Sequence, residues 1–327
     1  MRIRALVPLL VPKYGLFLFI AVLTGPLFSP VAAQSMSASA VEPSVRIAQK
    51  QRMIREGEQI KLSAGKMGYL WATLASSYHD AADGEKALAA YERALQLLRK
   101  DSADRANYAT VLDNLGALYL EYGRVAESES VRKHALAIRK EIGDPLDVAR
   151  SEEHMAEIAL ARHQYKDAEK GSRAAVETLS AAERNGDTHV GTELSALVTL
   201  TYAECMQSKQ EDGLLEAEKA MQMVERAYLP GSVEQAHVLM ALGFAQWKTG
   251  AITGAERSMQ DGLRIMREKR GEASRILIGA MFEYRDFLKA TARRAEVAMI
   301  ERQLSGMVPR VTMGACTGCV VSVYALR

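Results

Sequence analysis

One stretch of the sequence, residues 71–98, limits what this chain can fold into more than any other feature. It reads WATLASSYHDAADGEKALAAYERALQLL, which is the pattern of two short amphipathic helices joined by an Asp-Gly turn. Trp71 and Tyr78 share one face of the first helix, and Ala87 and Tyr91 share one face of the second. A single helix pair of this kind cannot bury its apolar stripe, so it needs similar neighbours.

Weaker copies of this stretch follow towards the C-terminus. One small residue recurs in the first helix and another in the second, each at intervals of 40 to 45 residues. The first-helix set is Ala75, Gly116, Ala156, Thr201 and Gly243, and the second-helix set is Ala94, Ala135, Ala175, Ala220 and Gly262. A degenerate sixth copy spans residues 275–304. Because small residues let helices approach closely, the copies predict a stack with one continuous core.

The order of large, small and turn residues resembles the tetratricopeptide repeat, Trp-x2-Leu-Gly-x2-Tyr followed by Ala-x3-Phe. Ala75 replaces the glycine and Tyr91 the phenylalanine. The second copy departs at Ser128 and Arg132, where alanine and an aromatic residue are expected. Since the copies exceed the minimal unit of about 34 residues, they resemble the long-repeat variety of kinesin light chains. The resemblance implies an all-α fold, a right-handed α-solenoid of tandem helix-turn-helix repeats.

Composition and local sequence set the expected boundaries of this solenoid. Residues 68–306 hold about six repeats, and Pro145 and Pro230 are the only prolines between residues 44 and 308. Aromatic residues make up only 6% of the chain, which favours helix over sheet. We expect residues 34–67 to be a flexible N-terminus followed by a capping helix, and residues 307–327 to be an extended tail.

The first 33 residues have the features of a cleaved signal peptide. Three basic residues, Arg2, Arg4 and Lys13, accompany an apolar run, and small residues at 29–33 offer a cleavage site before Gln34. The apolar run is about 15 residues long, against the ~20 needed to span a bilayer. This pattern predicts a periplasmic or secreted protein of the bacterial envelope, with no membrane contact beyond the signal peptide.

Charge and motif content exclude several functional classes. The formal net charge is +2 for the whole chain, and it falls close to zero once the basic signal segment is removed. A near-neutral protein has no field to hold nucleic acid, so we expect no nucleic-acid partner. The sequence contains no HExxH pair, no phosphate-cradling glycine loop and no GxSxG elbow. We therefore expect no cofactor, no metal and no catalytic activity.

The resemblance implies a concave groove lined by the first helix of each repeat. Four inner positions per helix, spaced three, four and three residues apart, run over 110–120, 150–160, 195–205, 237–247 and 279–289 in repeats two to six. Around repeats four to six they are apolar and aromatic. The hypothesis is that five of them form a platform for an extended or helical peptide: Tyr202, Met240, Phe244, Trp247 and Phe282. The alternative is that a tight superhelix or the C-terminal tail buries them.

A second mode of recognition is also implied by the resemblance, the clamping of a partner's C-terminal carboxylate. Asn114 matches one position of such a clamp in the second repeat, and Arg150 offers a basic group in the third. The other basic positions are not filled, because Ala72 and Ser76 stand at the matching places in the first repeat. The clamp is therefore incomplete.

The C-terminal tail carries a CxxC motif, Cys316 and Cys319. One CxxC supplies only half of a structural zinc site, and no strand-helix-strand context for a thioredoxin-like site precedes it. A local disulfide is the expected state in an exported protein. The β-branched tail itself is expected to cap the last repeat or to pair with a partner's sheet edge.

These observations predict an exported scaffold that binds a protein or peptide partner through its concave groove. Two alternatives stay open. In one, Cys316 and Cys319 perform thiol-redox or metal chemistry while the repeats dock a substrate. In the other, the protein is a homo-oligomer that associates through its end repeats.

Overall fold

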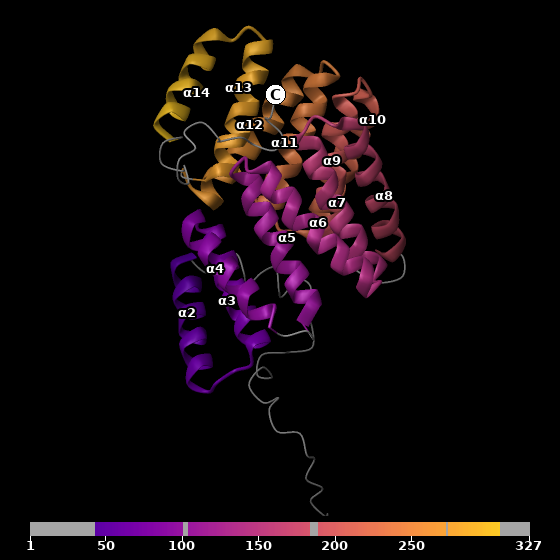
Figure 1. Cartoon of the computed structure of the whole chain (residues 1–327). Coiled ribbons are helices and arrows are strands. Elements are labelled where there is room, and N and C mark those ends of the chain that lie inside the picture. The colour runs from indigo at the N-terminus through magenta and orange to yellow at the C-terminus, as the bar shows by residue number, and fades with distance from the viewer. Residues whose placement is uncertain (1–42, 101–103, 184–188, 273, 308–327) are drawn as a thin grey trace, which may run out of the picture. The chain divides into compact units, whose positions relative to one another are not determined.

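A computed structural model describes residues 43–100, 104–183, 189–272 and 274–307 of the chain, all within one compact unit that begins at Pro43. Thirteen helices and no strand occur in this described part, so the predicted all-α solenoid is confirmed (Figure 1). The predicted signal peptide of residues 1–33 lies outside the described residues, as do Cys316 and Cys319. None of the helices described is both long and apolar enough to cross a bilayer.

The helices follow one another as a single leading helix and six antiparallel pairs. The leading helix is α2 (Pro43–Gln59), which packs on α3. The pairs are α3 (Ala64–Asp80) with α4 (Gly84–Leu98), α5 (Arg105–Glu121) with α6 (Val125–Ile142), α7 (Pro145–Ala161) with α8 (Tyr165–Glu183), α9 (Val190–Cys205) with α10 (Gln210–Ala227), α11 (Val233–Lys248) with α12 (Ile252–Arg270), and α13 (Arg275–Ala290) with α14 (Arg294–Met307). Each pair from α3 to α12 carries one copy of the small-residue pattern.

Side-chain caps fix where many of these helices begin. Ser63, Asp83, Ser232 and Ser274 each accept a hydrogen bond from the backbone N–H three residues further on. Asp144 caps α7 in the same way and is followed by a proline at the first helical position. The caps satisfy backbone donors that have no partner inside the helix.

The turn inside each pair has the same backbone conformation. One turn residue adopts a positive φ of 58° to 84° in all six pairs. It is the second residue after the first helix in five pairs and the third in the pair of α9 and α10, and the six residues are Ala82, Gly123, His163, Ser208, Gly250 and Ala292. Only two of these six residues are glycine, although a left-handed conformation strains any residue with a Cβ atom. The six turns therefore share a geometry that the sequence does not mark uniformly.

Close approach of the two helices in a pair explains the small residues of the repeat. A Cβ atom on Gly116 would stand 2.6 Å from Cγ of Arg132, and one on Gly243 would stand 2.6 Å from Cγ of Met259. Both distances are shorter than van der Waals contact allows. The facing residue on the second helix thus occupies the space that a side chain would need.

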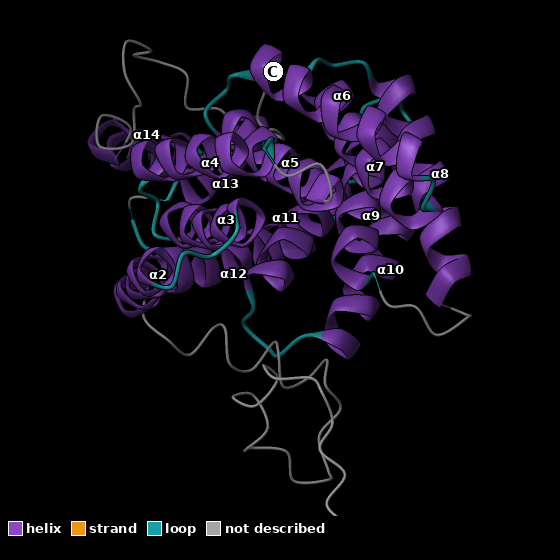
Figure 2. Ribbon diagram, turned by 60° about the horizontal axis from the view of Figure 1, so that its bottom comes forward, coloured by secondary structure: helices purple, strands orange, loops and turns teal. Residues whose placement is uncertain are grey.

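The first helices of successive pairs line the inner side of the superhelix, where α3, α5, α7, α9 and α11 contact one another in order. Late helices return to the early ones, as both views in Figures 1 and 2 indicate. Arg270 at the end of α12 contacts the Asp80 carboxylate at 2.8 Å, and the Arg275 guanidinium lies 3.5 Å from the centre of the Tyr122 ring. These contacts, here called the seam, close the inner side.

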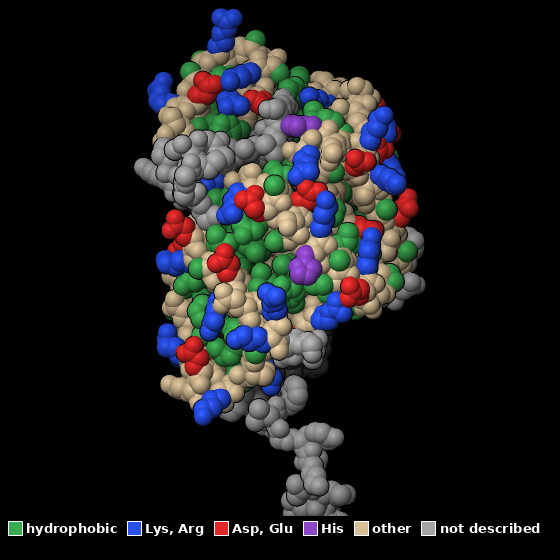
Figure 3. All heavy atoms as spheres, viewed as in Figure 1, with side chains coloured by type: hydrophobic (Ala, Val, Ile, Leu, Met, Phe, Trp, Pro, Cys, Tyr) green, Lys and Arg blue, Asp and Glu red, His purple; other side chains and the backbone are tan. Residues whose placement is uncertain are grey.

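The outer surface carries charges of both signs. On the face shown in Figure 3, lysine and arginine side chains alternate with aspartate and glutamate over the described helices. This mixture agrees with the small net charge of the sequence. The inner side of the superhelix differs from this evenly mixed surface in the charge and polarity of its side chains.

Candidate ligand-binding cavity

The inner side of the superhelix encloses a cavity of about 340 Å³. Its walls come mainly from the first helices of repeats two to six, that is from α5, α7, α9, α11 and α13. Five consecutive repeats therefore contribute to one site, which we call the inner cavity. A cavity of this size is in the range of small-ligand sites and can hold a few side chains of a peptide.

Most of the inner cavity wall is apolar. The apolar lining includes Leu120, Leu194, Val198, Val238, Met240 and Ile276. Several of these residues are almost fully buried by their neighbours, with Val238 at 1% and Met240 at 3% exposure. An apolar wall of this kind favours an occupant that carries hydrophobic side chains.

Among the polar groups of the inner cavity, negatively charged side chains outnumber positively charged ones. Four carboxylates line it, those of Glu121, Glu157, Glu234 and Glu283, but only two guanidinium groups, those of Arg132 and Arg275. In addition, His154 and His237 contribute imidazole rings. Burial, helped by the Arg270 charge, lowers the pKa of His237 and so favours its neutral form. The excess of carboxylates favours an occupant with positive charge.

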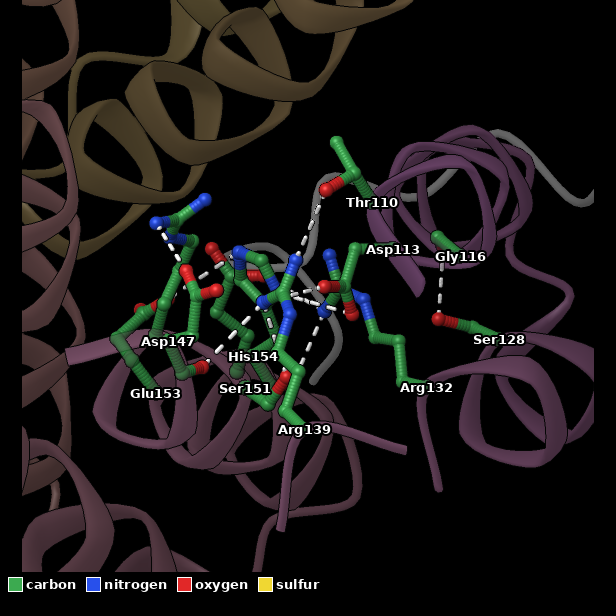
Figure 4. A network of polar contacts seen from close by, with 12 residues as sticks. Thr110, Asp113, Gly116, Ser128, Arg132, Arg139, Asp147, Ser151, Glu153 and His154 are labelled. Atoms are coloured by element: carbon green, nitrogen blue, oxygen red, sulfur yellow. Dashed lines mark hydrogen bonds and ion pairs between the residues drawn. The ribbon is translucent and has the colours of Figure 1, made fainter. Parts of the chain in front are cut away.

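Arg132 is the most deeply buried charge of the cavity wall, with 2% of its side chain exposed. It reaches from α6 to α7, where its Nη1 donates to the His154 carbonyl at 2.9 Å and to the Glu157 carboxylate at 2.7 Å. Its Nε has no hydrogen-bond acceptor among the described residues. Next to it, Ser128 donates to the Gly116 carbonyl at 2.7 Å. Figure 4 shows this network from close by.

A second buried ion pair supports the same wall from behind. Arg139 of α6 contacts the Asp113 carboxylate of α5 at 2.8 Å, and both side chains are about as buried as Arg132. Arg139 also donates to Ser151 at 3.0 Å and to Thr110 at 3.3 Å. These partners of Arg139 come from α5 and α7, and Figure 4 shows them around its guanidinium group. The ion pair holds the two helices of repeat two together, and the Arg139–Ser151 hydrogen bond links them to repeat three.

Two neighbouring carboxyl groups on α7 differ in protonation. Burial, reinforced by the charge of Glu157, raises the pKa of Glu153 well above its ordinary value. Burial acts in the same direction on Glu157, but Arg132 and His154 outweigh it and lower the pKa of that carboxyl. Ser195 of α9 contacts both, at 2.9 Å and 3.0 Å. Burial thus favours the neutral form of Glu153, while Arg132 and His154 favour the ionised form of Glu157.

The opposite wall is fixed by a contact between residues 81 positions apart in the sequence. The Tyr202 hydroxyl of α9 lies 3.0 Å and 3.1 Å from the two oxygens of Glu283 on α13. Both residues are buried, with 2% and 3% exposure. A phenol that donates to a buried carboxylate joins repeat four to repeat six across the cavity.

The predicted aromatic platform is not one exposed surface. Tyr202 and Met240 do line the inner cavity, but Phe244 is 1% exposed and packs on Tyr202 at 4.7 Å between ring centres. Trp247 and Phe282 are partly buried against the same core and lie outside the cavity lining. For Phe244 the structure agrees with the alternative left open by the sequence, burial by a tight superhelix, and its role in partner binding stays a prediction. Whether the others contact a partner stays a prediction.

The predicted carboxylate clamp is not assembled in the described structure. Asn114 is exposed and is not part of the cavity lining. Arg150 contacts Asp147 of its own helix at 2.6 Å. The inner register holds in repeats two to five, where Ala117, Glu157, Ser195 and His237 line the cavity. In repeat six it is displaced, since α13 contributes Ile276, Ala280 and Glu283 instead.

Sequence reasoning missed Arg132, His154 and Glu283 as cavity residues. One signal could have revealed Arg132, because it stands where the repeat pattern expects an aromatic residue. A charge in place of a core filler needs a buried partner, and Glu157 is that partner. Glu283 has no comparable mark. The described residues contain no cluster of three or more metal-ligating side chains.

Comparison with known proteins supports the fold. Residues 67–141 match the tetratricopeptide repeat family. BtubC (BKLC) from P. vanneervenii is 18% identical, with a TM-score of 0.53, and the alignment covers 71% of this chain and 93% of that one. The apo form of RapI is 12% identical with a TM-score of 0.62, and the alignment covers 83% and 99%. The Rap conjugation regulator of plasmid pLS20, in complex with the Phr* peptide, is 10% identical with a TM-score of 0.60, covering 82% and 71%.

The repeat pattern, the six helix pairs and these likenesses together define the class of the molecule. Residues 67–141 match the tetratricopeptide repeat family, and the chain folds as a superhelix of helix pairs that resembles the Rap and BtubC structures. No curated protein matches its sequence.

Proposed function

We propose that this protein is a non-catalytic scaffold that binds a peptide segment of a partner protein in the inner cavity. The observation that carries the proposal is the cavity itself, since five successive repeats direct their first helices into one apolar, carboxylate-rich space. A peptide supplies both hydrophobic and cationic groups on a narrow chain that such a space accommodates. The similar Rap regulator of pLS20 is described in complex with a peptide, which supports the same ligand class here.

The test is selection of binders from a displayed library of random 12-residue peptides on the full chain. Synthetic copies of the selected peptides are then measured by fluorescence anisotropy. Ala117 lines the cavity and is only half-buried, so Ala117→Phe fills part of the space without disturbing a closed core. We expect this variant to weaken peptide binding at least about tenfold, which is about 1.4 kcal/mol.

The matched control is Ala174→Phe, which adds the same bulk at an exposed position on α8. It should leave peptide binding within about twofold of the original chain. Peptides that bind the Ala117→Phe chain as well as the original one would place their site outside the inner cavity and contradict the proposal.

We further propose that the mature protein is exported after removal of residues 1–33. The basic start, the short apolar run and the small residues before Gln34 support this. Amino-terminal sequencing of the protein from its native cell tests it directly. A mature chain that begins at Gln34 is the expected result, and one that retains Arg2 and Arg4 contradicts it.

A further inference from the structure

The inner cavity raises the question of what occupies it before a partner arrives. Its wall leaves apolar side chains such as Ala117 and Ile276 partly exposed, and its carboxylates outnumber its guanidinium groups. Such a surface is poorly satisfied by water alone and favours a chain that is both apolar and basic. The sequence of this protein contains one such segment, directly after the last described helix.

Residues 308–327 follow the last described helix and read VPRVTMGACTGCVVSVYALR. The segment has five valines, a leucine and a tyrosine, two arginines (Arg310 and Arg327), and no aspartate or glutamate. Its hydrophobic content matches the apolar wall, and its arginines match the excess of carboxylates. Both features required of an occupant are therefore present in one stretch of 20 residues.

The position at which this segment leaves the described chain places the cavity within reach. Helix α14 ends at Met307, which shares an outer groove with Met281 and Tyr284 of α13. Other residues of the same α13 helix, Ala280 and Glu283, line the inner cavity. A helix is about 10 Å across, whereas 20 extended residues span up to about 70 Å. The segment is long enough to pass around α13 and enter the cavity.

The nearest competing site is the outer groove itself, which has a volume of about 600 Å³ between α12, α13 and α14. Three arginines line it, Arg264, Arg267 and Arg302, against a single carboxylate, Glu272. Because Arg264 and Arg267 already pair with carboxylates, this groove offers a basic segment no excess of negative charge. The outer groove also has apolar lining residues, including Met299 and Met307, so charge rather than hydrophobicity distinguishes the two sites. Charge thus favours the inner cavity over the outer groove.

We propose that residues 308–327 fold back into the inner cavity of the same chain and occupy the place of a partner peptide. Release of this segment is then a condition for partner binding, a consequence that rests on the function proposed above. Affinity for a partner is reduced by the fraction of molecules in which the segment is docked. The C-terminal segment is accordingly an intramolecular competitor.

Photocrosslinking in the full chain tests this placement. Tyr324 is replaced by the photoreactive analogue p-benzoylphenylalanine, and the crosslinked residues are found by mass spectrometry. We expect crosslinks to the cavity walls, within residues 194–202 or 237–240, or at Ile276, Ala280 or Glu283. Crosslinks to the outer groove, crosslinks to a second copy of the chain, or no crosslink to the protein each overturn the proposal.

Charge reversal tests the stated reason for docking. In the crosslinking chain, Arg310→Glu with Arg327→Glu turns attraction towards the cavity carboxylates into repulsion, so the yield of cavity crosslinks should fall about five- to tenfold. Lys166→Glu with Lys170→Glu makes the same change of charge at exposed sites on α8 and should leave the yield unchanged. Equal yields from both variants overturn the electrostatic argument.

Peptide selection on the original chain and on the Arg310→Glu, Arg327→Glu chain separates this proposal from the proposed function. Tighter peptide binding by the charge-reversed chain supports intramolecular competition. Equal binding by both chains overturns the competition while leaving the proposed function intact. Cavity crosslinks from Tyr324, combined with no peptide binder for either chain, support the docked segment and contradict the proposed function.

Discussion

Buried charges set the stability of individual positions in this solenoid. The Arg139 guanidinium and the Asp113 carboxylate are each almost fully removed from water and compensate one another at 2.8 Å. Removal of one partner leaves an uncompensated buried charge, which costs about 3–5 kcal/mol. By contrast, Arg105 and Glu141 form an ion pair with both side chains about half exposed, a class of contact worth about 0–1 kcal/mol.

We predict that Asp113→Ala lowers the free energy of unfolding by about 3–5 kcal/mol, measured by urea denaturation. The matched change in the exposed pair, Glu141→Ala, should lower it by less than about 1 kcal/mol. Replacement of both buried charges, Asp113→Leu with Arg139→Met, should recover most of the loss, because no unpaired charge remains. Similar losses from Asp113→Ala and Glu141→Ala would show that burial does not determine how much an ion pair contributes to the free energy of unfolding.

In the turn inside each repeat, a substitution to glycine should raise the free energy of unfolding rather than lower it. Ala82 and Ala292 have φ angles of 58° and 59°, where a Cβ atom is strained by about 1–2 kcal/mol. Glycine relieves the strain but gains entropy in the unfolded chain, so each Ala→Gly change should stabilise by about 0.5–1 kcal/mol. At Ala174, in the middle of α8, the same change should destabilise by about 1 kcal/mol. Thermal denaturation of the three variants measures both signs.

At the scale of helices, local pattern predicted the elements well. Trp71 and Tyr78 lie on one face at helical spacing, and such periodicity is set by neighbours within four residues. The turns and small residues follow the same local logic. Arg132 does not, because the repeat pattern specifies only that its position is buried, and a charge there depends on a partner 25 residues away.

The shape of the cavity depends on contacts between residues far apart in the sequence, which a local sequence pattern does not predict. Tyr202 meets Glu283 only because the superhelix brings repeat four and repeat six together across 81 residues. The same curvature buries Phe244, which the linear register placed on an open groove. Each small difference in helix angle accumulates over successive repeats, so the sequence predicts the lining helices but not how tightly they close.

Helix α9 is joined to α8 through a carboxyl with a perturbed pKa. Burial of Glu204 raises its pKa to about 7, although the contacting Arg173 of α8 lowers it. The folded state therefore retains a proton that an unfolded carboxyl, with a pKa near 4.5, has already lost. Between those two values the free energy of unfolding falls as pH rises, by a total on the order of 3 kcal/mol.

We predict that Glu204→Gln removes this part of the pH dependence, because the amide does not ionise. The difference in unfolding free energy between variant and original chain should shift in favour of the variant from pH 5 to pH 8. Urea denaturation at both values measures it. Glu177→Gln, at an exposed carboxyl on α8, is the control and should show no such shift.

For the whole molecule, the seam determines whether the superhelix is closed. Arg270 contacts Asp80, and Arg275 stacks on Tyr122, so two arginines join repeats five and six to repeats one and two. A third contact, between His79 and Glu121 at 2.9 Å, lies on the early side of the seam. The Glu121 carboxylate overcomes the effect of burial and raises the pKa of His79. This interaction is complete below the ordinary histidine pKa of about 6.5 and weakens as pH rises through the raised value.

Because so few contacts close the seam, one charge reversal should open it. Arg270→Glu places a carboxylate against Asp80 and near Glu121, where repulsion replaces attraction. We predict a larger radius of gyration by small-angle X-ray scattering with unchanged helix content by circular dichroism. Arg267→Glu, one turn earlier on α12 and partnered only by the exposed Glu272, should change neither. An unchanged radius for Arg270→Glu would mean that helix packing, and not the seam, holds the superhelix closed.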